Sequence, residues 1–345
     1  MLNPQLNYTD LLNNEYKRYG RHLILKNIGI NGQKRLKNAK ILLIGAGGLG
    51  CPAIIYLASC GIGYLGIIDH DQIEESNLHR QILYNQTDIN EFKVKSAKRK
   101  IHEINSLCKV NIYPYRLTYN NSIDIIKNYD IIIDASDNYD TRYIIDFTCY
   151  KLHKIHIYGA IQNFEGQMSV FNYKNGPRYI DIYPKSLNLK EQKCNELGVL
   201  GILPGIIGIL QATEVIKIIL GIGQILSGYF IIYNALNMSF KKVKIPHIIK
   251  QYYLQNTNIH PKTIKIKKTI PILNLNELIN QKQYKLLLID VRQNIEFQNS
   301  HIRNSINIPL KKFKQKNTIE FIKNNCLHKK NYYLLQPRIS FNTCI

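Results

Sequence analysis

Short apolar runs alternate with segments of helical spacing over the first two thirds of the chain. Continuous apolar runs of this length are typical of strands that are buried on both faces of a sheet. Between them, Pro52–Ser59 and Lys95–Asn105 have the spacing of helices. The alternation predicts an α/β fold built on a doubly wound, mainly parallel sheet. The predicted strands are Ile41–Ile44, Leu65–Asp69, Val110–Tyr115, Asp130–Asp134, Ile155–Tyr158, Gly166–Phe171 and Gly228–Tyr233.

The same pattern divides the chain of 345 residues into three parts. Residues 1–243 carry the alternating strands and helices and are predicted to form one domain. Residues 244–268 are rich in Lys, Asn and Tyr and have few apolar repeats, which predicts a linker. The last part, residues 269–345, has Leu286–Asp290 as its clearest strand. It is short for an α/β domain, so we predict an incomplete α/β unit.

The most apolar stretch of the chain is Leu197–Ile222. It is interrupted by Pro204 and carries Glu214 and Lys217, which predicts a loop entering a buried helix rather than a membrane span. Met1–Asp10 lacks the apolar core of a signal peptide. The seven cysteines show no Cys-x-x-Cys spacing, which indicates a reducing compartment. We therefore predict a soluble protein with no membrane partner.

The formal net charge is +22, and the chain uses Lys, Asn, Ile and Tyr heavily. This usage indicates AT-rich coding, which accounts for much of the charge. The lysines are scattered and no recognised nucleic-acid-binding module is present, so we predict no nucleic-acid partner. A polyanionic nucleotide and an acidic protein partner fit the charge better. The composition favours a plastid-encoded protein of the stroma, with the cytoplasm of a low-GC bacterium as the alternative.

A glycine loop, Gly45-Ala46-Gly47-Gly48-Leu49-Gly50, follows the first predicted strand. Between a strand and a helix, such a loop lets backbone N–H groups approach phosphates at the positive end of the helix dipole. Asp69 closes the second predicted strand about 20 residues later, where an acid can hold a ribose. The pattern predicts a Rossmann-like nucleotide site, and by itself it fits many such sites.

Two cations and a further carboxylate narrow the choice of nucleotide. Arg80 and Lys93 are groups that a triphosphate needs and a nicotinamide does not, and they can neutralise charge at an attacked phosphate. Asp137 follows the strand Asp130–Asp134, where it can hold Mg²⁺ beside ATP. The alternatives are that Asp137 caps the helix before Thr141 and that the two cations lie on solvated helix faces.

Several spaced motifs together resemble the ThiF/MoeB/ubiquitin-activating superfamily. The resemblance runs from Asn14 to Lys241, and it implies ATP-dependent adenylation of the C-terminal glycine carboxylate of a small ubiquitin-like sulfur-carrier protein, with release of pyrophosphate. It also implies a homodimer. The motifs are Arg18-Tyr19-Gly20-Arg21-His22, the loop Gly45–Gly50, Asp69, Ser76–Gln81, Lys93, Asp137-Asn138 and Cys194–Gly201.

The resemblance also implies roles for individual residues. Arg80 and Lys93 stabilise the phosphates, Asp137 orients Mg²⁺, and Arg21 reaches the ATP of the other subunit. Cys194 resembles a cysteine that links covalently to the carrier in some members, and a buried inert thiol is the alternative. The residues implied to contact ATP are Gly45, Gly47, Gly48, Gly50, Asp69, Ser76, Asn77, Leu78, His79, Arg80, Lys93, Asp137 and Asn138.

The chain departs from the family at its structural zinc site. Members usually have Cys-x-x-Cys after a Gly-Pro and a second such pair later. Here Gly176-Pro177 is followed by Arg178 and Asp181 at the two cysteine positions, and Ile245–Lys250 lacks the second pair. We therefore predict no zinc, and an electrostatic pair between Arg178 and Asp181 in its place.

The last part of the chain resembles the first half of a rhodanese domain, on Asp290-Val291-Arg292, Glu296-Phe297 and His301–Leu310. Sulfur transfer there needs a loop cysteine after the strand Tyr332–Leu335. The sequence instead reads Gln336–Ile345, with Cys344 as an incidental thiol. We predict a truncated unit that does not transfer sulfur; a frame shift near Leu335 would explain the ending, and resequencing would reveal it.

Three classes of function follow from the sequence. The first is adenylation of a sulfur carrier of the molybdopterin-synthase type, for molybdenum cofactor biosynthesis, or of a carrier for thiamine or tRNA thiolation. The second is an NAD-dependent oxidoreductase, which leaves Lys93 and Arg80 without a role. The third is a non-catalytic scaffold, which the intact Lys93, Arg80 and Asp137 argue against.

Overall fold

The computed structural model describes residues 6, 9–185, 198–245, 286–290, 293–299, 305–309, 312, 318, 320–321 and 331–335. It divides into two compact units, Met1–Tyr253 and Leu254–Ile345, which are described separately. Residues 246–268 of the predicted linker lie outside the described residues.

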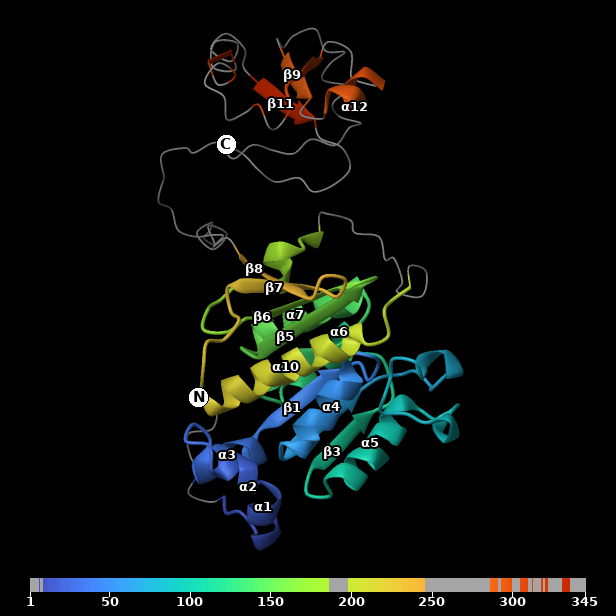
Figure 1. Ribbon diagram of the computed structural model, residues 1–345, viewed down its shortest axis with the longest axis vertical. Coiled ribbons are helices and arrows are strands. Elements are labelled where there is room, and N and C mark those ends of the chain that lie inside the picture. The colour runs from blue at the N-terminus through green and yellow to red at the C-terminus, as the bar shows by residue number, and fades with distance from the viewer. Residues whose placement is uncertain are drawn as a thin grey trace. The chain divides into compact units, whose positions relative to one another are not determined.

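An eight-stranded sheet forms the centre of the first unit, in the order β3-β2-β1-β4-β5-β6-β7-β8 (Figure 1). The strands from β3 to β5 run parallel, as predicted. The pairs β5–β6, β6–β7 and β7–β8 are antiparallel, which the sequence did not reveal. The strands are β1 (Lys40–Ile44), β2 (Tyr64–Ile68), β3 (Lys109–Tyr113), β4 (Ile131–Asp134), β5 (Ile155–Gln162), β6 (Glu165–Phe171), β7 (Tyr229–Asn234) and β8 (Ser239–Lys244).

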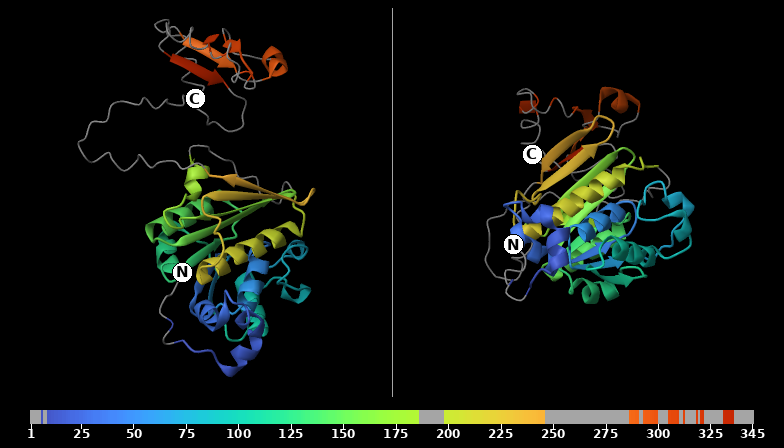
Figure 2. Two further views of the ribbon diagram at one scale, coloured as in Figure 1. Left: turned by 60° about the vertical axis from the view of Figure 1, so that its left-hand side comes forward. Right: turned by 60° about the horizontal axis from the view of Figure 1, so that its bottom comes forward.

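Helices cover both faces of this sheet (Figure 2). On one face α4, α5 and α10 pack together, and α6 and α7 pack on the other. The helices of this unit are α1 (Asn13–Arg18), α2 (Gly20–Leu23), α3 (Gly29–Asn38), α4 (Gly50–Ser59), α5 (Lys93–Ile104), α6 (Tyr119–Ile126), α7 (Tyr139–Lys151), α8 (Tyr179–Ile182) and α10 (Leu203–Leu220).

The central strands are buried on both faces because their side chains alternate between two cores. In β1, Ile41 and Leu43 join the core under α4, α5 and α10. Leu42 and Ile44 join the core under α6 and α7. All four are 3% exposed or less, so each apolar residue of the predicted run contributes to packing.

Helix α10 is the buried helix predicted within Leu197–Ile222. It is long and apolar enough to cross a membrane by composition, and 61% of it is buried inside the protein, as in a core helix. Its charged pair is satisfied internally: Lys217 contacts Glu214, which also accepts a hydrogen bond from the backbone N–H of Leu226. Burial against α4 and β5 explains its composition.

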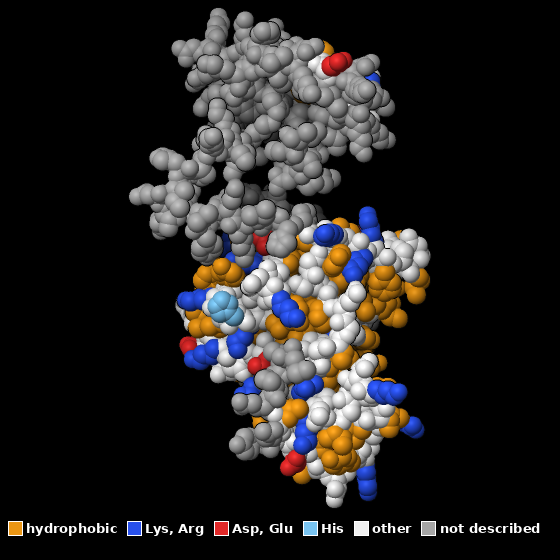
Figure 3. Space-filling view, turned by 90° about the vertical axis from the view of Figure 1, so that its left-hand side faces the viewer, with side chains coloured by type: hydrophobic (Ala, Val, Ile, Leu, Met, Phe, Trp, Pro, Cys, Tyr) orange, Lys and Arg blue, Asp and Glu red, His pale blue; other side chains and the backbone are white. Residues whose placement is uncertain are grey.

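Strand β8 ends the described sheet, and all six of its residues are exposed. It carries Lys241, Lys242 and Lys244 along one short strand. Elsewhere on the visible face in Figure 3, basic side chains are interspersed with apolar and neutral ones. This scatter agrees with the interpretation of the net charge as compositional.

The second unit has a three-stranded parallel sheet in the order β10-β9-β11. Its described elements are β9 (Leu286–Asp290), α12 (Asn294–Asn299), β10 (Ser305–Asn307) and β11 (Asn331–Leu335). The predicted strand Leu286–Asp290 is confirmed as β9, with Ile289 and Asp290 buried.

Candidate functional site

The candidate site lies where the order of the parallel strands reverses. From β1 the chain proceeds to β2 and β3 on one side, and β4 and β5 lie on the other. The loops that follow β1, β2 and β4 carry the glycine loop, Asp69 and Asp137. The carboxyl ends of strands at such a switch point are the usual ligand site of an open α/β sheet.

The glycine loop follows β1, and α4 begins at its last glycine. Gly45 has a φ of +101°, and a Cβ there would lie 2.5 Å from the carbonyl oxygen of Ala135. A Cβ at Gly50 would overlap the carbonyl oxygen of Gly45, and one at Gly48 would lie 3.0 Å from Cβ of Pro204. Glycine is therefore required at Gly45 and Gly50, where a Cβ would meet the backbone of a neighbouring segment.

Asp69 joins the glycine loop to the segment after β2. Its Oδ2 accepts a hydrogen bond from the N–H of Ala46 at 2.8 Å, and its Oδ1 accepts one from the N–H of Asp71 at 2.9 Å. Burial raises the pKa of Asp69, against the charge of Lys93 and these two N–H groups. The carboxylate therefore lies fixed beside the loop, where a ribose hydroxyl group can reach it.

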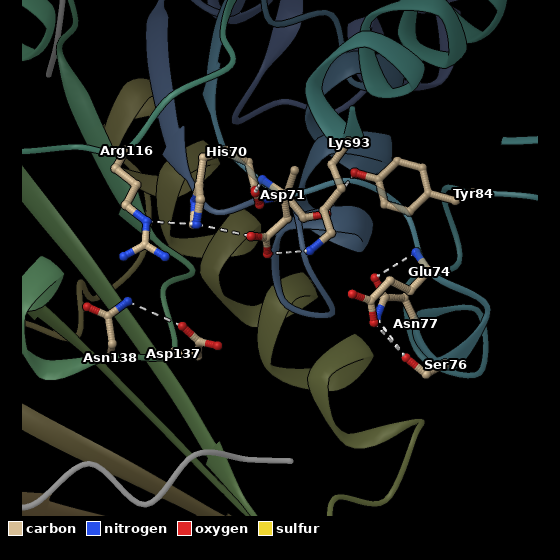
Figure 4. Close-up of polar contacts among 12 residues, drawn as sticks. His70, Asp71, Glu74, Ser76, Asn77, Tyr84, Lys93, Arg116, Asp137 and Asn138 are labelled. Atoms are coloured by element: carbon tan, nitrogen blue, oxygen red, sulfur yellow. Dashed lines mark hydrogen bonds and ion pairs between the residues drawn. The ribbon is translucent and has the colours of Figure 1, made fainter. Parts of the chain in front are cut away.

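Lys93, the first residue of α5, is paired with a carboxylate that the sequence analysis missed. Its Nζ lies 2.8 Å from Oδ2 of Asp71 (Figure 4). The Lys93 side chain is 7% exposed, and that of Asp71 is 48% exposed. Burial opposes ionisation of Asp71, but the hydrogen bond and charge of Lys93, aided by His70 and Arg116, prevail and lower its pKa. The alternative of a solvated face is therefore wrong for Lys93.

The segment between β2 and α5 places Arg80 beside the glycine loop. A Cβ at Gly48 would lie 3.7 Å from Cγ of Arg80. The Arg80 guanidinium is held by its own segment: Nη1 donates to the carbonyl oxygen of Ser76 at 2.9 Å and lies 2.7 Å from Nε2 of His79. Asn77 is buried, and its Oδ1 accepts from the N–H of Glu74 at 3.3 Å. Leu78 packs against the hydrophobic core under α4, α5 and α10, and this packing anchors the segment that carries Arg80.

Asp137 and Asn138 have separate roles after β4. Asn138 is the N-cap of α7, because its Oδ1 accepts from the N–H of Thr141 at 2.9 Å. The interpretation of Asp137 as that cap is therefore wrong. Asp137 is exposed, and its Oδ1 accepts a hydrogen bond from Nδ2 of Asn138 at 3.3 Å (Figure 4). An exposed carboxylate of this kind fits Mg²⁺, which prefers oxygen ligands and retains several waters.

We expect Asn138→Ala to lower the free energy of unfolding by about 1 kcal/mol, because α7 loses its N-cap hydrogen bond. Urea titration followed by circular dichroism measures the change. Asn138→Asp keeps a capping oxygen and serves as the control. An alanine variant as stable as the wild type would contradict this role.

The structure also reveals a buried cation under the Asp137 loop. Arg142 of α7 is 8% exposed, and its Nη2 donates to the carbonyl oxygen of Ser136 at 3.0 Å. Asp134 accepts from both the N–H and the hydroxyl of Ser136, at 3.0 and 2.6 Å. These bonds fix the residue that precedes Asp137. The only signal in the sequence is an arginine one turn into the helix after Asp137.

The structure does not bring Arg21 to this site within one subunit. Arg21 is exposed on α2, next to residues that contact the far ends of α4 and α5. His22 lies 3.1 Å from Gln33, which donates to Cys60 at the end of α4, and Arg18 donates to Ile104 at the end of α5. Both helices begin at the glycine-loop side of the sheet, so Arg21 lies at the opposite edge.

Cys194 lies outside the described residues. Where the family usually has its first zinc-binding cysteine, Arg178 forms an ion pair with Asp146 and stacks on Tyr150 at 3.9 Å from the ring centre. Among the described residues, the Asp181 carboxylate accepts a hydrogen bond from the backbone N–H of Arg178, at 2.8 Å. The predicted side-chain pair between Arg178 and Asp181 is therefore wrong, because Asp146 of α7 is the nearer buried carboxylate.

Comparisons with known proteins identify the family of the chain. The ThiF family model matches residues 19–252, and the rhodanese-like domain model matches residues 273–334. A protein of Gracilaria tenuistipitata var. liui named probable molybdopterin-synthase adenylyltransferase is 50% identical over 320 residues, which is 91% of this chain and 88% of its own. Adenylyltransferase and sulfurtransferase MOCS3 of Dictyostelium discoideum is 40% identical over 333 residues, 90% of this chain and 78% of its own.

Among solved structures, E. coli MccB crystallised with ATP superposes with a TM-score of 0.57 at 24% identity, over 66% of this chain and 71% of its own. That likeness concerns the fold alone. The ThiF family model covers more than half of this chain, and both relatives are more than 30% identical over most of their own length. The chain therefore belongs to the ThiF family.

Proposed function

We propose that the chain adenylates the C-terminal glycine carboxylate of a small ubiquitin-like sulfur-carrier protein, for molybdenum cofactor biosynthesis. The observation that carries the proposal is the gathering of a glycine loop, Asp69, Lys93, Arg80 and Asp137 at one edge of the sheet. The names of the close relatives support this choice of reaction.

In the proposed reaction ATP is a substrate whose phosphates lie along the glycine loop and whose ribose meets Asp69. A carboxylate oxygen of the carrier attacks the α-phosphorus, the bond to the β-phosphate oxygen breaks, and pyrophosphate leaves with the electron pair. Lys93 and Arg80 stabilise the negative charge that develops on the phosphates. No general base is required, because the attacking carboxylate is already ionised at neutral pH.

Mg²⁺ is part of the proposal because the exposed carboxylate of Asp137 fits it. Bound there, the ion would supply charge neutralisation for the triphosphate. Asp137 would hold it, and the hydrogen bonds of Ser136 and Asn138 keep the backbone on either side of Asp137 fixed.

A homodimer is the proposed assembly, with Arg21 of one subunit reaching the ATP of the other. The place of α2 at the opposite edge of the sheet supports this, since Arg21 lies away from the site of its own chain.

Three further proposals complete this assignment. Cys194 is able to link to the carrier, the protein holds no zinc, and it acts in the plastid stroma. The red-algal relatives support the last point.

ATP–pyrophosphate exchange tests the proposed function. We expect the purified protein to incorporate labelled pyrophosphate into ATP only when a carrier with an intact C-terminal glycine is present. Carriers of molybdopterin, thiamine and tRNA-thiolation type, each compared with a variant lacking that glycine, identify the substrate. Exchange without any carrier, or none with all three, would reject the reaction. Reduction of NAD in its place would favour the oxidoreductase alternative.

A further inference from the structure

Asp71 is joined by several hydrogen bonds to two candidate ATP-binding residues, Asp69 and Lys93. Its backbone N–H donates to Oδ1 of Asp69 at 2.9 Å, and its carbonyl oxygen accepts from the N–H of Lys93 at 3.0 Å. Its side chain holds Nζ of Lys93 at 2.8 Å. The backbone N–H, the backbone carbonyl and one carboxylate oxygen of Asp71 thus each contact one of these two residues, and Figure 4 shows the carboxylate contact with Lys93.

Main-chain pairing sets this arrangement before any ligand is bound. Gln72 forms an antiparallel bridge with Phe92, and the backbone of Ile73 exchanges hydrogen bonds with Asn90 and Glu91. This short ribbon fixes the start of α5 against the end of β2. The Lys93 side chain therefore leaves α5 directly beside Asp71.

The position of Lys93 is electrostatically unfavourable without Asp71. A cation at the first residue of a helix opposes the helix dipole, and α5 has no acidic residue in its first turn and no side-chain cap. The Lys93 side chain is also buried, so water cannot compensate fully. Among the described residues, Asp71 supplies the ion pair that compensates.

The second oxygen of Asp71 does not weaken this pairing. Oδ1 lies 3.1 Å from Nε2 of His70, and that same nitrogen lies 2.8 Å from Nε of Arg116. His70 therefore lies between Arg116 and Asp71, against the carboxylate oxygen that Lys93 does not use. Lys93 has Oδ2 of Asp71 to itself among the described residues.

We propose that Asp71 is a positioning residue for the adenylation, which holds the Lys93 ammonium at the carboxyl edge of the sheet, ready for the phosphates of ATP. The inference rests on the proposed function. Since an ammonium has three N–H donors, Lys93 keeps its bond to Asp71 and offers the others to phosphate oxygens. Asp71 itself does not contact ATP.

Kinetics of exchange with Asp71→Asn test this role. We expect kcat to fall at least about tenfold because Lys93 loses its anchor, while KM for ATP stays unchanged or falls, since one negative charge leaves the neighbourhood of a polyanion. Asp71→Glu keeps the charge and is expected to retain more kcat than Asp71→Asn. Glu75→Gln removes an equal charge from an exposed side chain of the same segment and should leave both constants within twofold.

Wild-type kcat in Asp71→Asn would overturn the proposal, as would a loss confined to KM. If that variant does not fold, Asp71→Ser takes its place with the same expected split. The wild-type protein and Lys93→Met are measured in parallel. An inactive wild-type protein rejects the proposed function, whereas an active one with an unaffected Asp71→Asn rejects only the role of Asp71.

Discussion

Replacing Lys93 with methionine is expected to lower the rate of carrier-dependent ATP–pyrophosphate exchange by about 10²- to 10³-fold. The ammonium is the cation that the structure places at the start of α5, buried and aimed by Asp71. Its contribution grows as charge develops on the phosphates, so the loss falls mainly on kcat. Initial rates over a range of ATP concentrations measure it.

The same variant is expected to fold. Methionine removes a cation from an unfavourable helix terminus, and the half-exposed Asp71 that remains is solvated by water. Lys98→Met, on an exposed position of the same helix, is the matched control and should exchange at the wild-type rate. Wild-type exchange by Lys93→Met would remove the mechanism proposed above.

Neutralising Asp137 is expected to cause the second large loss of ATP–pyrophosphate exchange. Asp137→Asn is expected to reduce exchange by about 10²-fold or more, because the Mg²⁺ ligand at the end of β4 is lost. Stability should stay within about 0.5 kcal/mol of the wild type, as for other exposed substitutions, since Asn138 and not Asp137 caps α7. Exchange rates at several Mg²⁺ concentrations, together with urea titration, measure both quantities.

Asp140→Asn provides the comparison for Asp137, because it removes an equal charge from an exposed position in the first turn of α7. It should exchange like the wild-type protein. Equal losses in the two variants would mean that the general charge near α7, rather than a ligand at Asp137, determines the rate.

The sequence predicted the parallel half of the sheet because its central strands β1, β2 and β4 are nearly continuous apolar runs. It did not reveal the antiparallel half, since β5 and β6 show the same composition whichever way they run. Strand β8 was not predicted because its residues, Ser239–Lys244, are all exposed and show no alternation of burial. Patterns of hydrophobic residues predict buried strands. They do not tell whether neighbouring strands are parallel or antiparallel, and they do not reveal an edge strand whose residues are all exposed to solvent.

The sequence predicted the site residues that directly follow parallel strands. It did not predict the residue whose position depends on hydrogen bonding between two loops. Asp69 and Asp137 each follow a strand of the same parallel set, so their common edge followed from the fold class. Asp71 was missed because its link to Lys93 requires the ribbon between segments that lie about 20 residues apart. Asp137 and Asn138 are neighbours with similar capping preferences, and only coordinates separate their roles.

The lysines of β8 have a consequence for the behaviour of the protein in concentrated solution. A terminal strand with unpaired backbone groups is a template on which another copy can add a strand, and this is how many sheets begin to aggregate. Two β8 strands brought together would place Lys241, Lys242 and Lys244 of each against those of the other. We expect their repulsion to oppose such pairing at low ionic strength and to weaken as salt screens it.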